Sequence, residues 1–176
     1  MQLLIEKGKY GFFSYALMGI MLAFGIVLQI ADSFISFGVP GGKLGIANVI
    51  TVINVFLFGG MNAAVVSSLR AFLGCILSGA VSAVPYSVSG AAASAAAMAL
   101  MKKCFYPKVS ETGISVTGAC VHNLAQIAVA CVIFENTAII SYGTVLISVG
   151  IVSGIITGII ARQLFEKLGL KKYSVI

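Results

Sequence analysis

The stretch GFFSYALMGIMLAFGIVLQIA, residues 11–31, contains no charged side chain. At about 1.5 Å of helix rise per residue it is long enough to cross a hydrocarbon core about 30 Å thick, so it predicts a membrane-spanning helix. Lys7 and Lys9 precede this stretch, as basic residues do in a signal peptide. Because the apolar run is longer than the core of a typical signal and further runs follow it, we expect it to remain in the mature protein.

The rest of the chain repeats this apolar character. Of the 176 residues, 60% are hydrophobic and 9% are charged, with a mean hydropathy of +1.10. A soluble domain carries about 25% charged residues, so this composition excludes an ordinary water-exposed surface. We therefore predict one all-α transmembrane domain over residues 1–176 with six helices. The spans are expected near residues 11–31, 44–60, 62–80, 82–101, 113–134 and 142–162.

Two glycine-rich segments separate the first three predicted spans. Residues 59–62, Gly-Gly-Met-Asn, are typical of a tight turn between the second and third spans. Residues 32–43 form a longer polar loop that contains Pro40 and several glycines, and it would lie over the outer end of the helices.

The basic residues predict the orientation. The spans place nine of the 11 lysines and arginines on one side, namely Lys7, Lys9, Lys102, Lys103, Lys108, Arg162, Lys167, Lys171 and Lys172. Lys43 alone lies on the other side, and Arg70 falls within a span. Since basic loops remain in the cytoplasm, both termini are expected there. Topology thus explains the net charge of +6, and no nucleic-acid partner is predicted.

Several polar side chains fall at membrane depth, where they are costly and mark functional sites. Arg70 lies eight residues into its span, which corresponds to about 12 Å. His122 lies at a similar depth, and Gln126, four residues later, shares its helix face. Asn48 begins a row of polar residues, spaced by three, along the second span.

The charges of these residues favour an anionic ligand. Lys43 at the outer mouth and Arg70 are cations, and His122 is a potential one, whereas the nearest acids, Asp32 and Glu135, fall at outer ends of spans. An uncompensated cation in a low-dielectric site favours an anion, so we predict a bound phosphate, diphosphate or carboxylate. Structural alternatives stay open: Arg70 could bind backbone carbonyls or Asp32, His122 could bridge helices as a neutral ring, and Lys43 could reach the interface.

Other chemistries have little support. Gly41-Gly42-Lys43 lacks the correctly placed first glycine of a P-loop and the following Ser or Thr. The chain has one histidine and no CxxC pair among its four cysteines, so no metal site is predicted. A Ser–His–Asp site is not expected, because the sole aspartate, Asp32, is predicted far from the depth of His122. We predict no catalytic residue and no cofactor.

Small residues repeat at intervals of four on two spans. The first span carries Gly19 and Ala23, and the last carries Gly150, Gly154 and Gly158. Such stripes let helix backbones approach closely, either within one chain or against a partner membrane protein.

Three motifs resemble those of a bacterial membrane family. They are Pro40-Gly41-Gly42-Lys43-Leu44-Gly45-Ile46-Ala47-Asn48-Val49-Ile50-Thr51, the Ser-Leu-Arg-Ala-Phe-Leu-Gly segment around Arg70, and Val121-His122-Asn123-Leu124-Ala125-Gln126. The family is labelled heptaprenyl diphosphate synthase component I, or Gx transporter, and the similarity covers residues 12–160.

This resemblance implies two different functions. One is a subunit of a polyprenyl diphosphate synthase, and the other is an S-component, the six-helix substrate-capturing subunit of an energy-coupling-factor transporter. Prenyl-chain elongation needs clustered aspartates to hold magnesium on the diphosphate, and Asp32 is the only aspartate here. The chain is therefore not expected to be the catalytic synthase.

Our leading hypothesis is an S-component-like subunit of a bacterial importer in the cytoplasmic membrane, for a small anionic or isoprenoid-related compound. Six residues are expected to bind it: Lys43, Asn48, Arg70, His122, Asn123 and Gln126. Gly19 and Ala23 would contact a transmembrane T-component, which two ATPases drive. The alternative is a non-catalytic accessory that holds a prenyl diphosphate at the membrane.

Overall fold

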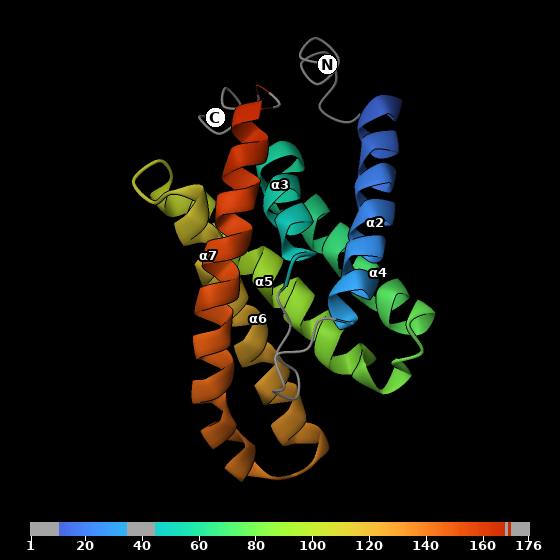
Figure 1. Cartoon of the computed structure of the whole chain (residues 1–176), viewed down its shortest axis with the longest axis vertical. Coiled ribbons are helices and arrows are strands. Elements are labelled where there is room, and N and C mark those ends of the chain that lie inside the picture. The colour runs from blue at the N-terminus through green and yellow to red at the C-terminus, as the bar shows by residue number, and fades with distance from the viewer. Residues whose placement is uncertain (1–10, 35–44, 168, 170–176) are drawn as a thin grey trace.

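The computed structural model describes residues 11–34, 45–167 and 169, and every regular element in these ranges is helical (Figure 1). The elements are α2 (Phe12–Ser33), α3 (Asn48–Phe58), α4 (Gly60–Leu77), η1 (Val81–Ala83), α5 (Val84–Phe105), α6 (Glu111–Ile133), η2 (Thr137–Tyr142) and α7 (Gly143–Lys167). The all-α prediction is confirmed. The predicted loop over residues 32–43 is wrong at its start, because Asp32 and Ser33 belong to the last turn of α2, and residues 35–43 lie outside the described residues.

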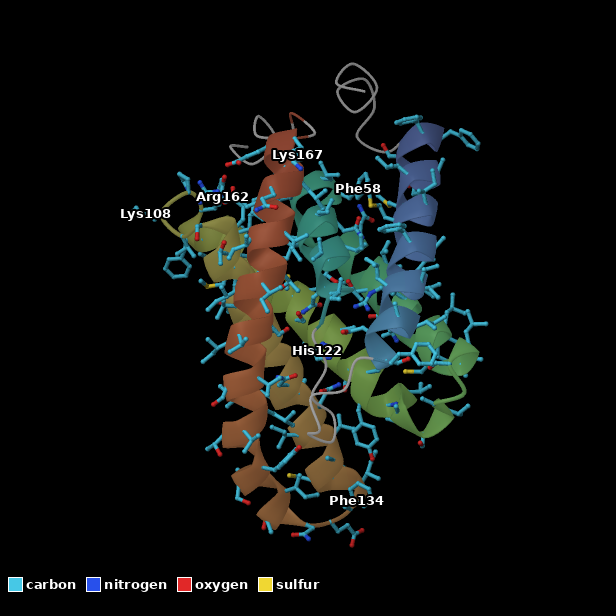
Figure 2. All side chains as sticks on the ribbon, viewed as in Figure 1. Phe58, Lys108, His122, Phe134, Arg162 and Lys167 are labelled. Carbon is cyan, nitrogen blue, oxygen red and sulfur yellow. The ribbon has the colours of Figure 1, made fainter. Side chains whose placement is uncertain are left out.

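The six α-helices alternate in direction, so the start of α2 and the end of α7 lie at the same end of the molecule (Figure 1). Lys108, Arg162 and Lys167 also gather at this end, whereas Phe134 marks the opposite end (Figure 2). This arrangement agrees with a shared side for most basic residues. Which side faces the cytoplasm stays a prediction.

Among the described residues, five helices are long and apolar enough to cross a membrane: α2, α4, the α5 segment, α6 and the α7 segment. The second predicted span instead forms α3, whose 11 residues extend only about 16 Å. Ten of these residues are buried, so the apolar character of this stretch reflects burial within the protein. The α3 helix ends at Phe58, and Gly59, with a φ of 82°, turns the chain into α4.

The hydrophobic core surrounds α3. Val52 and Phe56 pack in one cluster with Met98 of α5, Ile114 of α6 and Phe165 of α7. The Phe56 and Phe165 rings lie 5.2 Å apart between centroids. The chain thus places a short helix, rather than a sixth full span, at the centre of the five long helices.

The two small-residue stripes have different surroundings. A Cβ atom on Gly154 would lie 2.6 Å from the Val116 Cα, and one on Gly158 would lie 2.6 Å from the Thr112 Cα. The α7 stripe is therefore an intramolecular contact with α6. Gly19, by contrast, is exposed and has nothing within 4 Å of its added Cβ.

Candidate functional site

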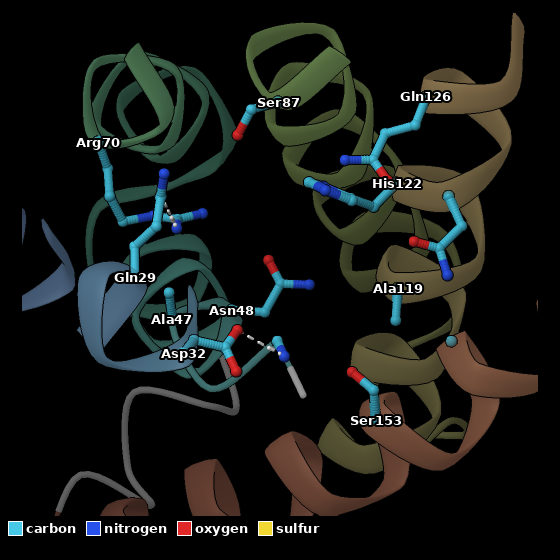
Figure 3. A pocket seen from close by; sticks show the side chains of 13 residues that line it. Gln29, Asp32, Ala47, Asn48, Arg70, Ser87, Ala119, His122, Gln126 and Ser153 are labelled. Carbon is cyan, nitrogen blue, oxygen red and sulfur yellow. Dashed lines mark hydrogen bonds between the residues drawn. The ribbon is translucent and has the colours of Figure 1, made fainter. Parts of the chain in front are cut away.

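A polar pocket lies among the six α-helices, at the level where α3 begins (Figure 3). Its volume is about 70 Å³. It is lined by Gln29, Asp32, Gly45, Ala47, Asn48, Arg70, Ser87, Ala119, His122, Asn123, Gln126, Gly150 and Ser153. Residues separated by more than 100 positions in sequence therefore share one small cavity.

Five of the six predicted binding residues line this pocket. Asn48 lies at the start of α3, Arg70 in the middle of α4, and His122, Asn123 and Gln126 along α6. The sixth, Lys43, falls outside the described residues. The structure thus brings the predicted residues together, and their role in binding stays a prediction.

Arg70 is the most deeply buried cation of the pocket, with 5% of its surface exposed. Its Nη1 donates a hydrogen bond of 2.7 Å to Oε1 of Gln29. Within the described part of the chain, its Nε has no hydrogen-bond partner. A guanidinium has five N–H donors, so Arg70 retains hydrogen-bonding capacity for a ligand.

Glycines make room for the polar side chains. An added Cβ would lie 2.6 Å from the Arg70 Cδ at Gly25, and 2.9 Å from the His122 Cε1 at Gly90. At Gly74 it would lie 2.5 Å from the Gln29 Nε2. Because real Cβ contacts are longer, a larger residue at any of these positions would displace a pocket side chain.

The pocket also contains an acid, which corrects the prediction of a purely cationic interior. Asp32 is 3% exposed, and its Oδ2 accepts a 2.8 Å hydrogen bond from the Gly45 backbone N–H. It lines the same pocket as Arg70, and the opposite charges of the two side chains attract. The last turn of α2 reaches the pocket, so Asp32 and His122 lie in one cavity, contrary to the sequence-based expectation.

Sequence reasoning overlooked Gln29 and Asp32 as pocket residues, although a signal was present. Gly25, Gln29 and Asp32 follow one another at intervals of four and three, so they share one face of α2. All three are buried. A polar face at the end of an apolar helix therefore indicated contact with the protein interior.

Asn123 has a structural contact in addition to its place in the pocket. Its Nδ2 donates a hydrogen bond to the Leu146 carbonyl of α7. A Cβ on Gly150 would lie 2.8 Å from this amide. Asn123 thus connects α6 to α7 next to the cavity.

The family model described as heptaprenyl diphosphate synthase component I matches residues 21–164. The chain belongs to this family. The matched segment contains all 13 residues that line the pocket, so the pocket lies within the family's common region. No curated protein and no solved structure matches the chain. The similarity to S-components has no support from these comparisons and stays a prediction.

The number of aspartates in the chain bears on the family's description. A single aspartate cannot form the two aspartate-rich motifs that hold magnesium in prenyl-chain elongation. That aspartate, Asp32, accepts a hydrogen bond from the Gly45 backbone N–H.

Proposed function

We propose that this protein is a non-catalytic membrane subunit that binds a small compound through an anionic group in the central pocket. The observation that carries the proposal is the burial of Arg70, with an Nε that has no partner among the described residues, in a pocket that His122 and four amide side chains also line. A buried charge requires partners, and Gln29 supplies only one of the hydrogen bonds that a guanidinium can make.

The neighbouring acid is compatible with an anionic ligand. One oxygen of Asp32 is occupied by the Gly45 N–H, so the carboxylate is held by the backbone. Arg70 still has an Nε donor without a partner among the described residues, which an anion could accept from, and Asp32 would balance the Arg70 charge when no anion is bound. Asn48, Asn123 and Gln126 would orient the ligand through neutral hydrogen bonds.

The role that we favour is substrate capture for an energy-coupling-factor-type importer, in the cytoplasmic membrane of a bacterium with both termini inside. The outward-facing Gly19 and Ala23 on α2 support this role, because small exposed residues allow close contact with another membrane helix. A T-component and its ATPases would be the partners.

The second candidate is an accessory role in heptaprenyl diphosphate synthesis, which the family's description favours. The partner would then be a soluble, aspartate-rich prenyl synthase. Affinity purification from membranes distinguishes the two roles: ATPase and T-component subunits would support import, and a prenyl synthase would support the accessory role.

The binding site itself is tested with inorganic diphosphate as the probe, after native mass spectrometry has identified any co-purified ligand. Removing a charged hydrogen-bond donor from a buried site costs about 2 kcal/mol or more, so R70A should weaken binding roughly 30-fold or more. R70K should retain part of the affinity, because it keeps the charge but loses the planar set of donors.

Arg162 provides the matched control, because this exposed arginine pairs with Glu166 on the surface of α7 at 3.3 Å. R162A should bind diphosphate as tightly as the wild type. Equal diphosphate affinity in R70A and the wild type, with both folded, would refute the proposed site.

A further inference from the structure

A second cavity lies directly beside the polar pocket. Its volume is about 380 Å³, and it lies between α5, α6, η2 and α7. Its walls are mainly apolar and include Tyr86, Ile127, Ala130, Phe134 and Leu146. This volume falls within the roughly 300–1,000 Å³ of typical small-molecule sites.

The two cavities share two wall residues, Ser87 of α5 and Gln126 of α6. In Figure 3 Ser87 projects from α5 into the polar pocket, and Gln126 of α6 lies next to His122. The apolar cavity therefore begins where the polar pocket ends. The two shared side chains are therefore in reach of a ligand in either cavity.

The sizes of the cavities limit what each can hold. The polar pocket of about 70 Å³ is far below the range of a complete ligand site, and it has room for one compact group. The neighbouring cavity has more than five times that volume and few polar atoms to bind. Together they form a site with a small polar part and a larger apolar part.

We propose that the two cavities bind a single amphiphilic ligand, with a compact anionic head at Arg70 and an apolar tail that passes between Ser87 and Gln126. This inference rests on the proposed function, because it takes the anion site at Arg70 as given. Burial of the tail removes apolar surface from water and so adds affinity to that of the head. Ser87 and Gln126 can hydrogen-bond to the polar atom that joins the head to the tail.

The test compares three probes in detergent: inorganic diphosphate, geranyl diphosphate and geraniol. They represent the head alone, the head with a ten-carbon tail, and the tail with a neutral end. Geranyl diphosphate should bind at least about tenfold more tightly than diphosphate, since several methylene groups become buried. It should also bind more tightly than geraniol.

Ala130 is half-buried and lines only the apolar cavity, so A130F should fill the tail space. The variant should lose the tenfold advantage of geranyl diphosphate while it keeps the affinity for diphosphate. A128F is the matched control, because Ala128 is exposed two residues away on the same helix. A83F, which fills the cavity from η1, replaces A130F if that variant fails to fold.

The possible failures are distinguishable. If diphosphate binds through Arg70 but geranyl diphosphate binds no more tightly, the inference is wrong and the proposed function stands. Geraniol binding as strong as that of geranyl diphosphate would mean that the cavity is a groove for lipid chains, which also overturns the inference. If R70A leaves diphosphate binding unchanged, the proposed function is wrong, and the inference that rests on it is wrong as well.

Discussion

The contact between α6 and α7 can be tested by placing one methyl group at Gly154. A Cβ at this position would lie 2.6 Å from the Val116 Cα, 0.8 Å closer than the 3.4 Å at which ordinary contact begins. Because the obstacle is backbone, no side-chain rotation relieves the overlap, and the helices have to separate. This packing also positions Ala119 and Ser153, which line the polar pocket.

The expected magnitude comes from overpacking, which typically destabilises a protein by about 1–3 kcal/mol. Ala also has a higher helix propensity than Gly, by about 1 kcal/mol, which would partly conceal the effect. Gly19→Ala measures this gain in helix propensity by itself. It makes the same exchange in α2, where no atom lies within 4 Å of the added Cβ. The difference between G154A and G19A should therefore be about 1–3 kcal/mol.

For a protein of this size, that difference corresponds to about 2–12 °C in the apparent Tm. The chain contains no tryptophan, so unfolding is followed with a thiol-reactive dye that reports the exposure of Cys75, which is buried in the folded protein, after the other three cysteines have been replaced by serine in both variants. G154A should release this thiol at a lower temperature than G19A. Equal Tm values for the two variants would refute the close α6–α7 contact at Gly154.

Two further perturbations test the pocket and the orientation. G90A should weaken diphosphate binding, as measured by titration calorimetry. The added Cβ would lie 2.9 Å from the His122 ring and push the ring into a pocket of about 70 Å³. Unchanged affinity would mean that the position of His122 does not affect binding. Cys104 is exposed in the last turn of α5, so a membrane-impermeant maleimide should label it in inside-out vesicles but not in intact cells, with C104S as the control. Labelling in intact cells would place the termini outside.

How much of the protein could be predicted from its sequence depends on the feature. Long apolar runs predict helices, because backbone N–H and C=O groups without hydrogen bonds are too costly in lipid. The five long helices lie within a few residues of their predicted ranges. The second run, 44–60, shows the limit of this reasoning. Apolar residues are equally suited to lipid and to a protein core, and composition alone does not distinguish them.

The candidate site shows a similar division. Arg70, His122, Asn123, Gln126 and Asn48 were predictable because polar groups are expensive in an apolar helix. Their convergence on one cavity of about 70 Å³ was not predictable, since it depends on how α3, α4 and α6 pack together.

The sequence by itself therefore determined the all-helical membrane character, the family and most of the polar residues that meet in the pocket. Only the tertiary structure decided that α3 is a buried half-length helix, that Asp32 and Gln29 join Arg70, and that an apolar cavity adjoins the polar pocket. The physical reason is that hydropathy is a property of each segment, whereas cavities and charge pairs arise from contacts between segments. Gly25, Gly74 and Gly90 allow those contacts, because they leave the space that Arg70, Gln29 and His122 occupy.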